Sequence, residues 1–247
     1  MKTAIRTVLA GLALACSFGP LAAREEDKPN PAATKTKPFN MKRHQTFLKR
    51  IADSKAEGDV VFYGDSITQG WEGNKKAWEA FKEFKPVNLG ISGEQTGHVL
   101  WRITEGKELA DLKPKAAVIM IGTNNTGRHT AEQIAGGIKA IVEELKKQKP
   151  EMKILLLGVF PRAGKGPGKG ATMVKKEDLA PKIKQINDLI SKLDDGKTVF
   201  YKDIGEKFLD ADGNLPKDVM PDYLHLSAKG YQIWADAIKD DLAKLAK

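Results

Sequence analysis

The sequence of 247 residues has a single cysteine, Cys16, which lies close to the amino terminus. A disulfide within one chain needs two cysteines, and a zinc–thiolate site needs several. Because Cys16 lies in a segment that we expect to be removed, the mature chain also lacks a cysteine nucleophile. The sequence therefore supports none of these three cysteine-based structures or activities.

The first two dozen residues contain no apolar run long enough for a membrane span. Residues 7–18 are mainly apolar, Lys2 and Arg6 precede them, and the small-residue segment 19–23 follows. This pattern is typical of a bacterial-type secretory signal peptide, so we expect residues 1–23 to be removed and the protein to be secreted or periplasmic. The alternative is a lipoprotein anchored at Cys16, which Ala13 fits poorly, and membrane contact is expected only with that anchor.

The chain also lacks the features of a nucleic-acid-binding protein, although it is basic. Its 41 Lys and Arg residues outnumber 32 Asp and Glu residues, which gives a net charge of +9, and aromatic residues make up only 7%. The basic residues are spread over many segments, and no stripe of arginine and aromatic residues accompanies them. We therefore expect a solvated basic surface and no nucleic-acid partner.

Two motifs for anions or metals begin in the sequence but are incomplete. The glycine- and lysine-rich segment 164–170 lacks the Gly-Lys-Ser/Thr ending of a phosphate loop, and is interpreted as a mobile basic loop. Segment 210–214 has the opening spacing of a calcium loop, but Leu215 stands at the glycine position and Pro221 at the closing glutamate. We read it as a turn, and we expect no metal and no cofactor.

Hydrophobic patterning divides the remaining chain into a linker and one domain. Residues 24–40 carry charges and prolines without an apolar period, which predicts a flexible linker, and residues 41–247 form the domain. Strands and helices are expected to alternate, which is typical of a three-layer α/β/α fold with a five-stranded parallel sheet and the flavodoxin-like strand order 2-1-3-4-5. The expected strands are 59–63, 86–89, 116–121, 153–159 and 198–201. The expected helices are 41–56, 75–84, 96–109, 130–149, 175–193 and 227–246.

Chemically useful residues follow each expected strand, at the sheet edge where parallel sheets bind ligands. These residues are Asp65 and Ser66, the glycine-containing segment 90–93, Asn124 and Asn125, Pro161 and Arg162, and the segment 222–225. Since the carboxyl ends of parallel strands share one edge, we expect these groups to meet there.

The same residue types make up the machinery of a serine hydrolase. Ser66 is a candidate nucleophile, and in a helical turn Asp222 and His225 would share a face, so that the carboxylate fixes the imidazole tautomer. The Gly93 N–H and the Asn124 amide are candidate donors to an oxyanion. Taken alone, Ser66, Gly93 and Asn124 are better explained as turn or loop residues. The pair of Asp222 and His225 is equally well explained as a surface histidine near a helix start. Their arrival at one edge favours the hydrolase.

The chain resembles the SGNH (GDSL-type) hydrolases, whose four sequence blocks are matched by segments 64–67, 93, 122–125 and 222–225. Within that family it is most similar to the catalytic subunits of the platelet-activating-factor acetylhydrolase subgroup, through segments 88–96 and 98–102. The resemblance implies the SGNH hydrolase fold. It implies that Ser66 is the nucleophile and His225 the base, with Asp222 behind it. It also implies an oxyanion hole formed by the N–H groups of Ser66 and Gly93 with the Asn124 amide.

The expected activity is therefore that of a secreted serine ester hydrolase. It would remove a short acyl group, acetyl above all, from a carbohydrate or similar polar ester through an acyl-enzyme, and that ester is its expected partner. The expected export and the absence of a long apolar insertion favour this substrate class. The alternatives are a lysophospholipase or platelet-activating-factor acetylhydrolase-like lipid esterase, and a non-catalytic polysaccharide-binding module on the same fold. The sequence does not indicate an oligomeric state.

Overall fold

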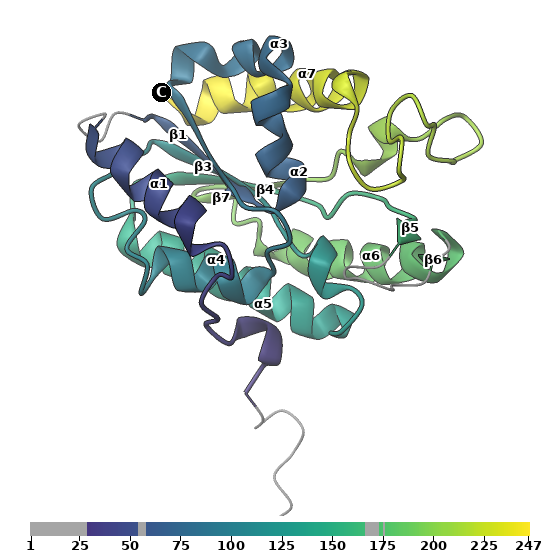
Figure 1. Ribbon diagram of the computed structural model, residues 1–247, viewed down its shortest axis with the longest axis horizontal. Helices are drawn as coiled ribbons and strands as arrows, with labels where there is room; N and C mark the ends of the chain where they lie inside the picture. The colour runs from purple at the N-terminus through teal and green to yellow at the C-terminus, as the bar shows by residue number, and fades with distance from the viewer. Residues whose placement is uncertain (1–28, 54–57, 166–172, 175) are drawn as a thin grey trace, which may run out of the picture.

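A parallel β-sheet between two layers of helices forms the centre of the molecule, which is described by a computed structural model over residues 29–53, 58–165, 173–174 and 176–247 (Figure 1). The sheet has five strands in the order β2-β1-β3-β4-β7. The strands are β1 (Val60–Gly64), β2 (Pro86–Gly90), β3 (Ala116–Met120), β4 (Lys153–Leu157) and β7 (Val199–Lys202). The three-layer fold and the strand order predicted from the sequence are both confirmed.

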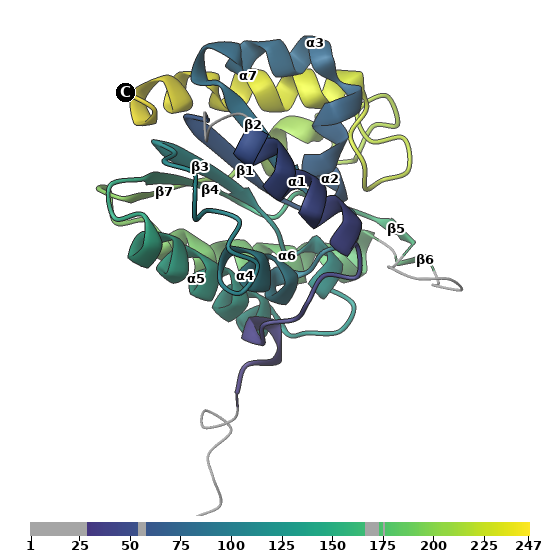
Figure 2. The ribbon, with the colours of Figure 1, turned by 60° about the vertical axis from the view of Figure 1, so that its left-hand side comes forward.

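The helices bury both faces of the sheet (Figures 1 and 2). One face is covered by α1 (Met41–Asp53), α4 (Thr96–Ile103), α5 (Ala131–Gln148) and α6 (Lys176–Ile190); the other is covered by α2 (Ser66–Gln69), α3 (Lys75–Trp78) and α7 (Ala228–Leu245). Within β1, Val61 and Tyr63 belong to the first core, whereas Val60 and Phe62 belong to the second. Because both faces are buried, the strand is apolar throughout instead of alternating.

Short 3₁₀ helices and a pair of two-residue strands make up the remaining regular structure of the described residues. The 3₁₀ helices are Pro31–Ala33, Gly70–Gly73, Glu79–Phe84, Thr123–Asn125, Ser191–Leu193 and Gly205–Phe208. Strands β5 (Gly164–Lys165) and β6 (Met173–Val174) pair antiparallel and project away from the main sheet (Figure 2). The sequence predicts a mobile loop over residues 164–170. The centre of that loop and the predicted leader, residues 1–23, lie outside the described residues.

One predicted helix ends earlier than expected. The sequence predicts a helix over residues 96–109, but α4 ends at Ile103. Lys107 has a φ of 52°, outside the helical region, and the Glu108 N–H then donates to the Arg102 carbonyl over 3.1 Å. The Glu108 carboxylate also accepts a hydrogen bond from Arg102 over 2.8 Å. After the end of α4, the chain thus folds back and places the buried Glu108 carboxylate against the buried Arg102 guanidinium.

Residues 29–40, which we call the strap, pack against α4 and α5 (Figure 1), although the sequence predicts a flexible linker over 24–40. The Asn30 side-chain amide donates to the Gln133 carbonyl over 2.9 Å, and the Thr36 N–H donates to the Gly97 carbonyl over 3.1 Å. The Thr96 hydroxyl donates to the Ala32 carbonyl over 2.6 Å. These contacts use main-chain groups and small residues, which a search for apolar periodicity does not detect.

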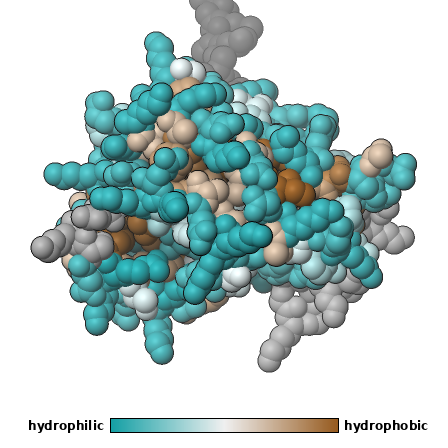
Figure 3. Space-filling view, turned by 90° about the horizontal axis from the view of Figure 1, so that it is seen from above, coloured by the Kyte–Doolittle hydropathy of each residue, from teal (hydrophilic) through white to brown (hydrophobic). Residues whose placement is uncertain are grey.

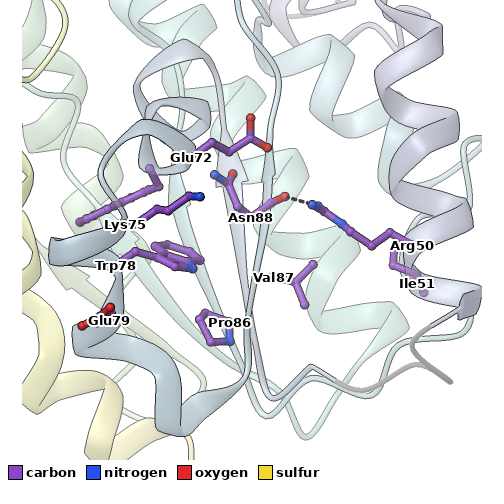
Figure 4. Close-up of a pocket in the computed structure, with 10 residues that line it drawn as sticks. Arg50, Ile51, Glu72, Lys75, Trp78, Glu79, Pro86, Val87 and Asn88 are labelled. Carbon is purple, nitrogen blue, oxygen red and sulfur yellow. Dashed lines mark hydrogen bonds between the residues drawn. The ribbon is translucent and has the colours of Figure 1, made fainter.

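Strand β2 forms one of the two edges of the sheet, and two arginines from α1 contact it. The Arg43 Nε–H donates to the Gly90 carbonyl over 2.8 Å, and Arg50 donates to the Asn88 carbonyl over 3.0 Å (Figure 4). A groove of about 560 Å³ lies beside this edge, lined in part by Trp78. None of the site residues predicted from the sequence lines this groove.

The surface is predominantly polar on the face seen from above, where hydrophobic residues show only as separate small areas (Figure 3). None of the helices in the described part of the chain combines the length and apolar character that a membrane crossing requires.

The contact between the strap and α5 yields a test based on two neighbouring glycines. Alanine usually stabilises a helix interior relative to glycine by about 1 kcal/mol. A Cβ at Gly137, however, would lie 2.6 Å from the Ala32 carbonyl oxygen and 2.7 Å from the Thr96 hydroxyl. We therefore expect Gly137→Ala to lower the free energy of unfolding in urea by about 1–3 kcal/mol.

The control is Gly136→Ala, whose Cβ would meet no main-chain atom but only the Asn30 side chain, at the cost of its hydrogen bond to Gln133. We expect it to be less destabilising than Gly137→Ala or even stabilising. Equal effects of the two substitutions on the urea midpoint would contradict close packing of the strap on α5.

Candidate active site

Ser66 lies at the carboxyl edge of the sheet, where β1 turns sharply into α2. Asp65 caps α2 by accepting the Ile67 N–H over 2.9 Å. A Cβ at Gly64 would lie 2.0 Å from the Thr68 hydroxyl and 2.4 Å from the carbonyl oxygen of residue 120, so the turn has room only for glycine. The Gly-Asp-Ser sequence thus ends the strand, caps the helix and places the serine hydroxyl at the edge.

The structure brings together the three residues that the sequence predicts as a catalytic set. Ser66 Oγ lies 2.9 Å from His225 Nε2, although the two residues are 159 positions apart. His225 Nδ1 lies 2.7 Å from Asp222 Oδ2. In this arrangement one imidazole nitrogen can accept the serine proton while the other donates to a carboxylate.

The segment that presents Asp222 and His225 is a turn stabilised by the Asp222 side chain, not the helical turn that the sequence predicts. Asp222 Oδ1 accepts the N–H groups of Leu224 over 3.1 Å and His225 over 2.7 Å. Between them, Tyr223 adopts a φ of 59°, a conformation that non-glycine residues seldom adopt. The Tyr223 carbonyl accepts the Ala163 N–H over 2.9 Å, which ties the turn to the loop after β4.

Asp222 is suited to orient the imidazole because it remains ionised. Partial burial raises the pKa of this carboxyl, but the hydrogen bonds from the ring and main chain of His225 outweigh that effect and lower the pKa below its ordinary range. The carboxylate is therefore negative at neutral pH, which favours the tautomer with the proton on His225 Nδ1.

The two predicted oxyanion donors beyond Ser66 belong to loops that are bonded to each other. Gly93 has a φ of 79°, which glycine adopts readily. Asn124 is buried and its side-chain amide donates to the Glu94 carbonyl over 2.9 Å, while the Gln95 amide donates to the Asn124 carbonyl over 3.0 Å. An amide has two N–H bonds, so the first contact leaves one for a substrate oxygen.

A buried charged network beneath the Gly93 loop is absent from the predictions made from the sequence. Arg102 lies 2.9 Å from a Glu94 carboxylate oxygen and 2.8 Å from Glu108, and His44 Nδ1 lies 2.9 Å from the other Glu108 oxygen. Burial raises the pKa of Glu94 to about 8, although Arg102 opposes this shift. The spacing of these four charged residues along the chain follows no helical or strand period. The sequence alone therefore does not indicate that they pair with one another.

Asp65 and Arg162 are a second pair of buried charged residues, close enough for the charge of each to influence the pKa of the other. Burial raises the pKa of Asp65 to about 6, against the opposing effects of the Ile67 N–H, His225 and Arg162. The buried Arg162 guanidinium donates to the carbonyl and hydroxyl oxygens of Thr123, each over 3.3 Å. The sequence placed both charged residues at the carboxyl ends of strands, which was the available signal, but assigned neither a role.

The other histidines have partners that explain them structurally. The His98 ring accepts the Gln95 N–H over 3.0 Å, and the His129 ring lies 3.3 Å from the Asn125 amide. Within the described residues, His, Cys, Asp and Glu side chains form no group of three or more that could hold a metal ion. Segment 210–214 is a turn closed by Asp210, which accepts the N–H groups of Asp212 and Asn214.

Comparison with known proteins shows which family the chain is similar to. Residues 62–233 match the model of the GDSL-like lipase/acylhydrolase family. The human platelet-activating factor acetylhydrolase IB subunit alpha1 is 38% identical over 207 residues, which cover 83% of each chain. The alpha2 subunit from Gallus gallus is 36% identical over 192 residues, covering 77% of this chain and 78% of that protein.

Solved structures share the same fold at lower sequence identity. A GDSL-like lipase from Bacteroides thetaiotaomicron superposes with a TM-score of 0.66 at 24% identity, over 81% of this chain and 97% of that one. A carbohydrate acetylesterase from Sinorhizobium meliloti superposes with a TM-score of 0.56 at 21% identity, over 76% of this chain and 100% of that one.

The raised pKa of the buried Asp65 carboxyl leads to a prediction about how the stability of the protein depends on pH. It ionises near 3.8 in the unfolded chain and at about 6 in the folded one, so the folded state holds its proton more tightly. The stabilisation from this proton is present below pH 4 and is lost as the pH rises to 6. Relative to the wild type, Asp65→Asn should therefore gain about 2 kcal/mol of unfolding free energy between pH 4 and pH 7.

Urea unfolding at both pH values measures this difference. Asp212→Asn is the matched control because Asp212 is exposed. We expect its difference from the wild type to stay constant. A constant difference for Asp65→Asn as well would show that the buried carboxyl does not titrate in this range.

Proposed function

The chain belongs to the GDSL-like lipase/acylhydrolase family, and on that premise we propose that it is a secreted serine ester hydrolase that removes short acyl groups, acetyl above all, from a carbohydrate or similar polar alcohol. The observation that carries the proposal is the unbroken pair of contacts from Ser66 Oγ to His225 at 2.9 Å and from His225 to Asp222 at 2.7 Å. A binding protein on the same fold has no need of such a proton relay.

In the first half of the proposed reaction, Ser66 Oγ attacks the ester carbonyl carbon as its proton moves to His225 Nε2. The carbonyl oxygen becomes an oxyanion, which accepts hydrogen bonds from the N–H groups of Ser66 and Gly93 and from the Asn124 amide. When the tetrahedral intermediate collapses, the bond to the alcohol oxygen breaks and His225 returns the proton to that oxygen. The free alcohol leaves and the acyl group stays on Ser66.

The second half repeats these steps with water. His225 takes a proton from the water molecule, whose oxygen attacks the acyl-enzyme, and the same donors hold the second oxyanion. Collapse of this intermediate returns the proton to Ser66 and releases the carboxylic acid. Asp222 remains ionised throughout, because its pKa lies below the ordinary range, and it stabilises the imidazolium formed in each half.

Two names among the similar proteins and one prediction from the sequence support the short acyl group and polar alcohol. The relatives above are named acetylhydrolases, and one protein with the same fold is named a carbohydrate acetylesterase. The leader predicted over residues 1–23 would direct the protein out of the cytoplasm, to a location in which carbohydrate esters are accessible.

The second candidate substrate is an acetylated lipid, and the name of the relatives at 36–38% identity favours it.

Removing the proposed nucleophile tests the reaction type. Ser66→Ala should lower kcat for 4-nitrophenyl acetate by a factor on the order of 10⁴ or more, because no other group can carry the acyl intermediate. A fluorophosphonate probe should label the folded wild type but not the variant, as measured by intact-protein mass spectrometry. Retained turnover in the variant contradicts the assignment, and an unlabelled folded wild type favours a non-catalytic binding module.

The length of the acyl group is a separate prediction. We expect kcat/KM for 4-nitrophenyl acetate to exceed that for the octanoate ester by at least about tenfold, because a short acyl pocket excludes the longer chain. Both esters release the same alcohol, so the ratio reports on the acyl side alone. A preference for the octanoate would contradict the short-acyl proposal without affecting the assignment of Ser66.

A further inference from the structure

Phe39 is the most exposed large hydrophobic side chain among the described residues. Its exposed fraction is 68%, compared with 36% for Leu48. A single exposed apolar residue is common on protein surfaces and needs no explanation by itself. What distinguishes Phe39 is where its ring lies and how its backbone is held.

The ring lies against the loop that carries a proposed oxyanion donor. The Phe39 Cζ atom is 2.9 Å from the position that a Cβ on Gly93 would occupy, so the ring can approach this closely only because residue 93 is glycine. The ring also meets His98 edge to face, with 5.5 Å between centroids and 86° between planes. An exposed aromatic surface therefore borders the candidate active site.

The backbone on both sides of Phe39 is fixed by bonds that do not use the ring. On one side, the Thr36 N–H donates to the Gly97 carbonyl, and Pro38 is buried. On the other side, Asn40 accepts the Arg43 N–H at the start of α1. Any residue at position 39 could satisfy these anchors, so they do not account for an aromatic side chain. They hold the backbone of Phe39 in place while the contact with His98 orients the ring, which lowers the entropy lost when a ligand packs on it.

We propose that Phe39 is a specificity-determining residue that packs against the alcohol part of the ester, with the C–H face of a sugar ring as its ligand. This inference rests on the proposed function. An acetyl group has only two carbons and ends close to Ser66, so a substrate atom that reaches an exposed ring at the rim belongs to the alcohol. A fixed aromatic face offers apolar contact area to the C–H face of a pyranose.

This contact acts on binding more than on chemistry. The alcohol lies over the ring both before and during attack by Ser66, so the contact contributes equally to the ground state and the transition state. Losing it should raise KM for a sugar ester and leave kcat comparatively little changed. A residue that only positioned the Gly93 loop would instead lower kcat, and for every ester.

The experiment compares two acetates with different alcohols, glucose pentaacetate and methyl acetate, whose methanol is too small to reach the rim. For Phe39→Ala we expect kcat/KM to fall about three- to tenfold more on glucose pentaacetate than on methyl acetate, with the difference in KM. Phe39→Tyr keeps the ring and should retain most of the wild-type value. Leu48→Ala is the control for losing an exposed apolar side chain and should affect both esters equally.

Three results would overturn the inference. Equal losses on both esters would make Phe39 a positioning residue for the Gly93 loop, and no loss on either would leave the ring without a substrate role. An acetylated phospholipid is assayed as a third ester, and a ring-dependent loss confined to it would assign the surface to lipid. If the wild type hydrolyses neither acetate and is not labelled by the fluorophosphonate, the proposed function is wrong. If the wild type turns over both acetates and Phe39→Ala affects them equally, only the inference about Phe39 is wrong.

Discussion

The level at which the three neighbouring strands β2, β1 and β3 end is the constraint on which the rest of the structure depends. Gly64 at the end of β1 pairs with Gly90 of β2 and with Met120 of β3. The loops that carry Ser66, Gly93 and Asn124 therefore leave the sheet from one line. A slip of one residue in this register would displace a loop by about 3.3 Å, enough to separate a nucleophile from its oxyanion donors. Main-chain hydrogen bonding across the sheet thus determines the geometry of the site.

Features encoded locally in the chain were accessible from the sequence alone. The uninterrupted apolar run of β1, the glycine after it and the polar residue after each strand depend on near neighbours and on the direction of the strands. These features were enough to predict the five-stranded sheet and to select Ser66 and His225 as residues that meet. Proximity between parts of the chain 159 residues apart followed from the shared edge, not from any sequence spacing.

Features that depend on contacts between distant residues were not accessible. Beyond the early end of α4, Glu108 bonds back to Arg102. The strap packs on α4 because the Ala32 carbonyl accepts the Thr96 hydroxyl and the Gly97 carbonyl accepts the Thr36 N–H. The left-handed conformation of Tyr223 arises in a turn that Asp222 closes with its own side chain. In each case the deciding partner is a polar group whose position along the chain follows no period.

The arginines of α1 that contact β2 have a consequence for assembly. An edge strand with open carbonyl groups is a template on which a second chain can add a strand. Here the Gly90 and Asn88 carbonyls already accept hydrogen bonds from Arg43 and Arg50, and Arg43 is itself held by Glu72 at 2.9 Å. Two copies of this protein cannot merge their sheets across β2 unless α1 first moves away. The helix thus protects the folded chain against edge-to-edge polymerisation on that side.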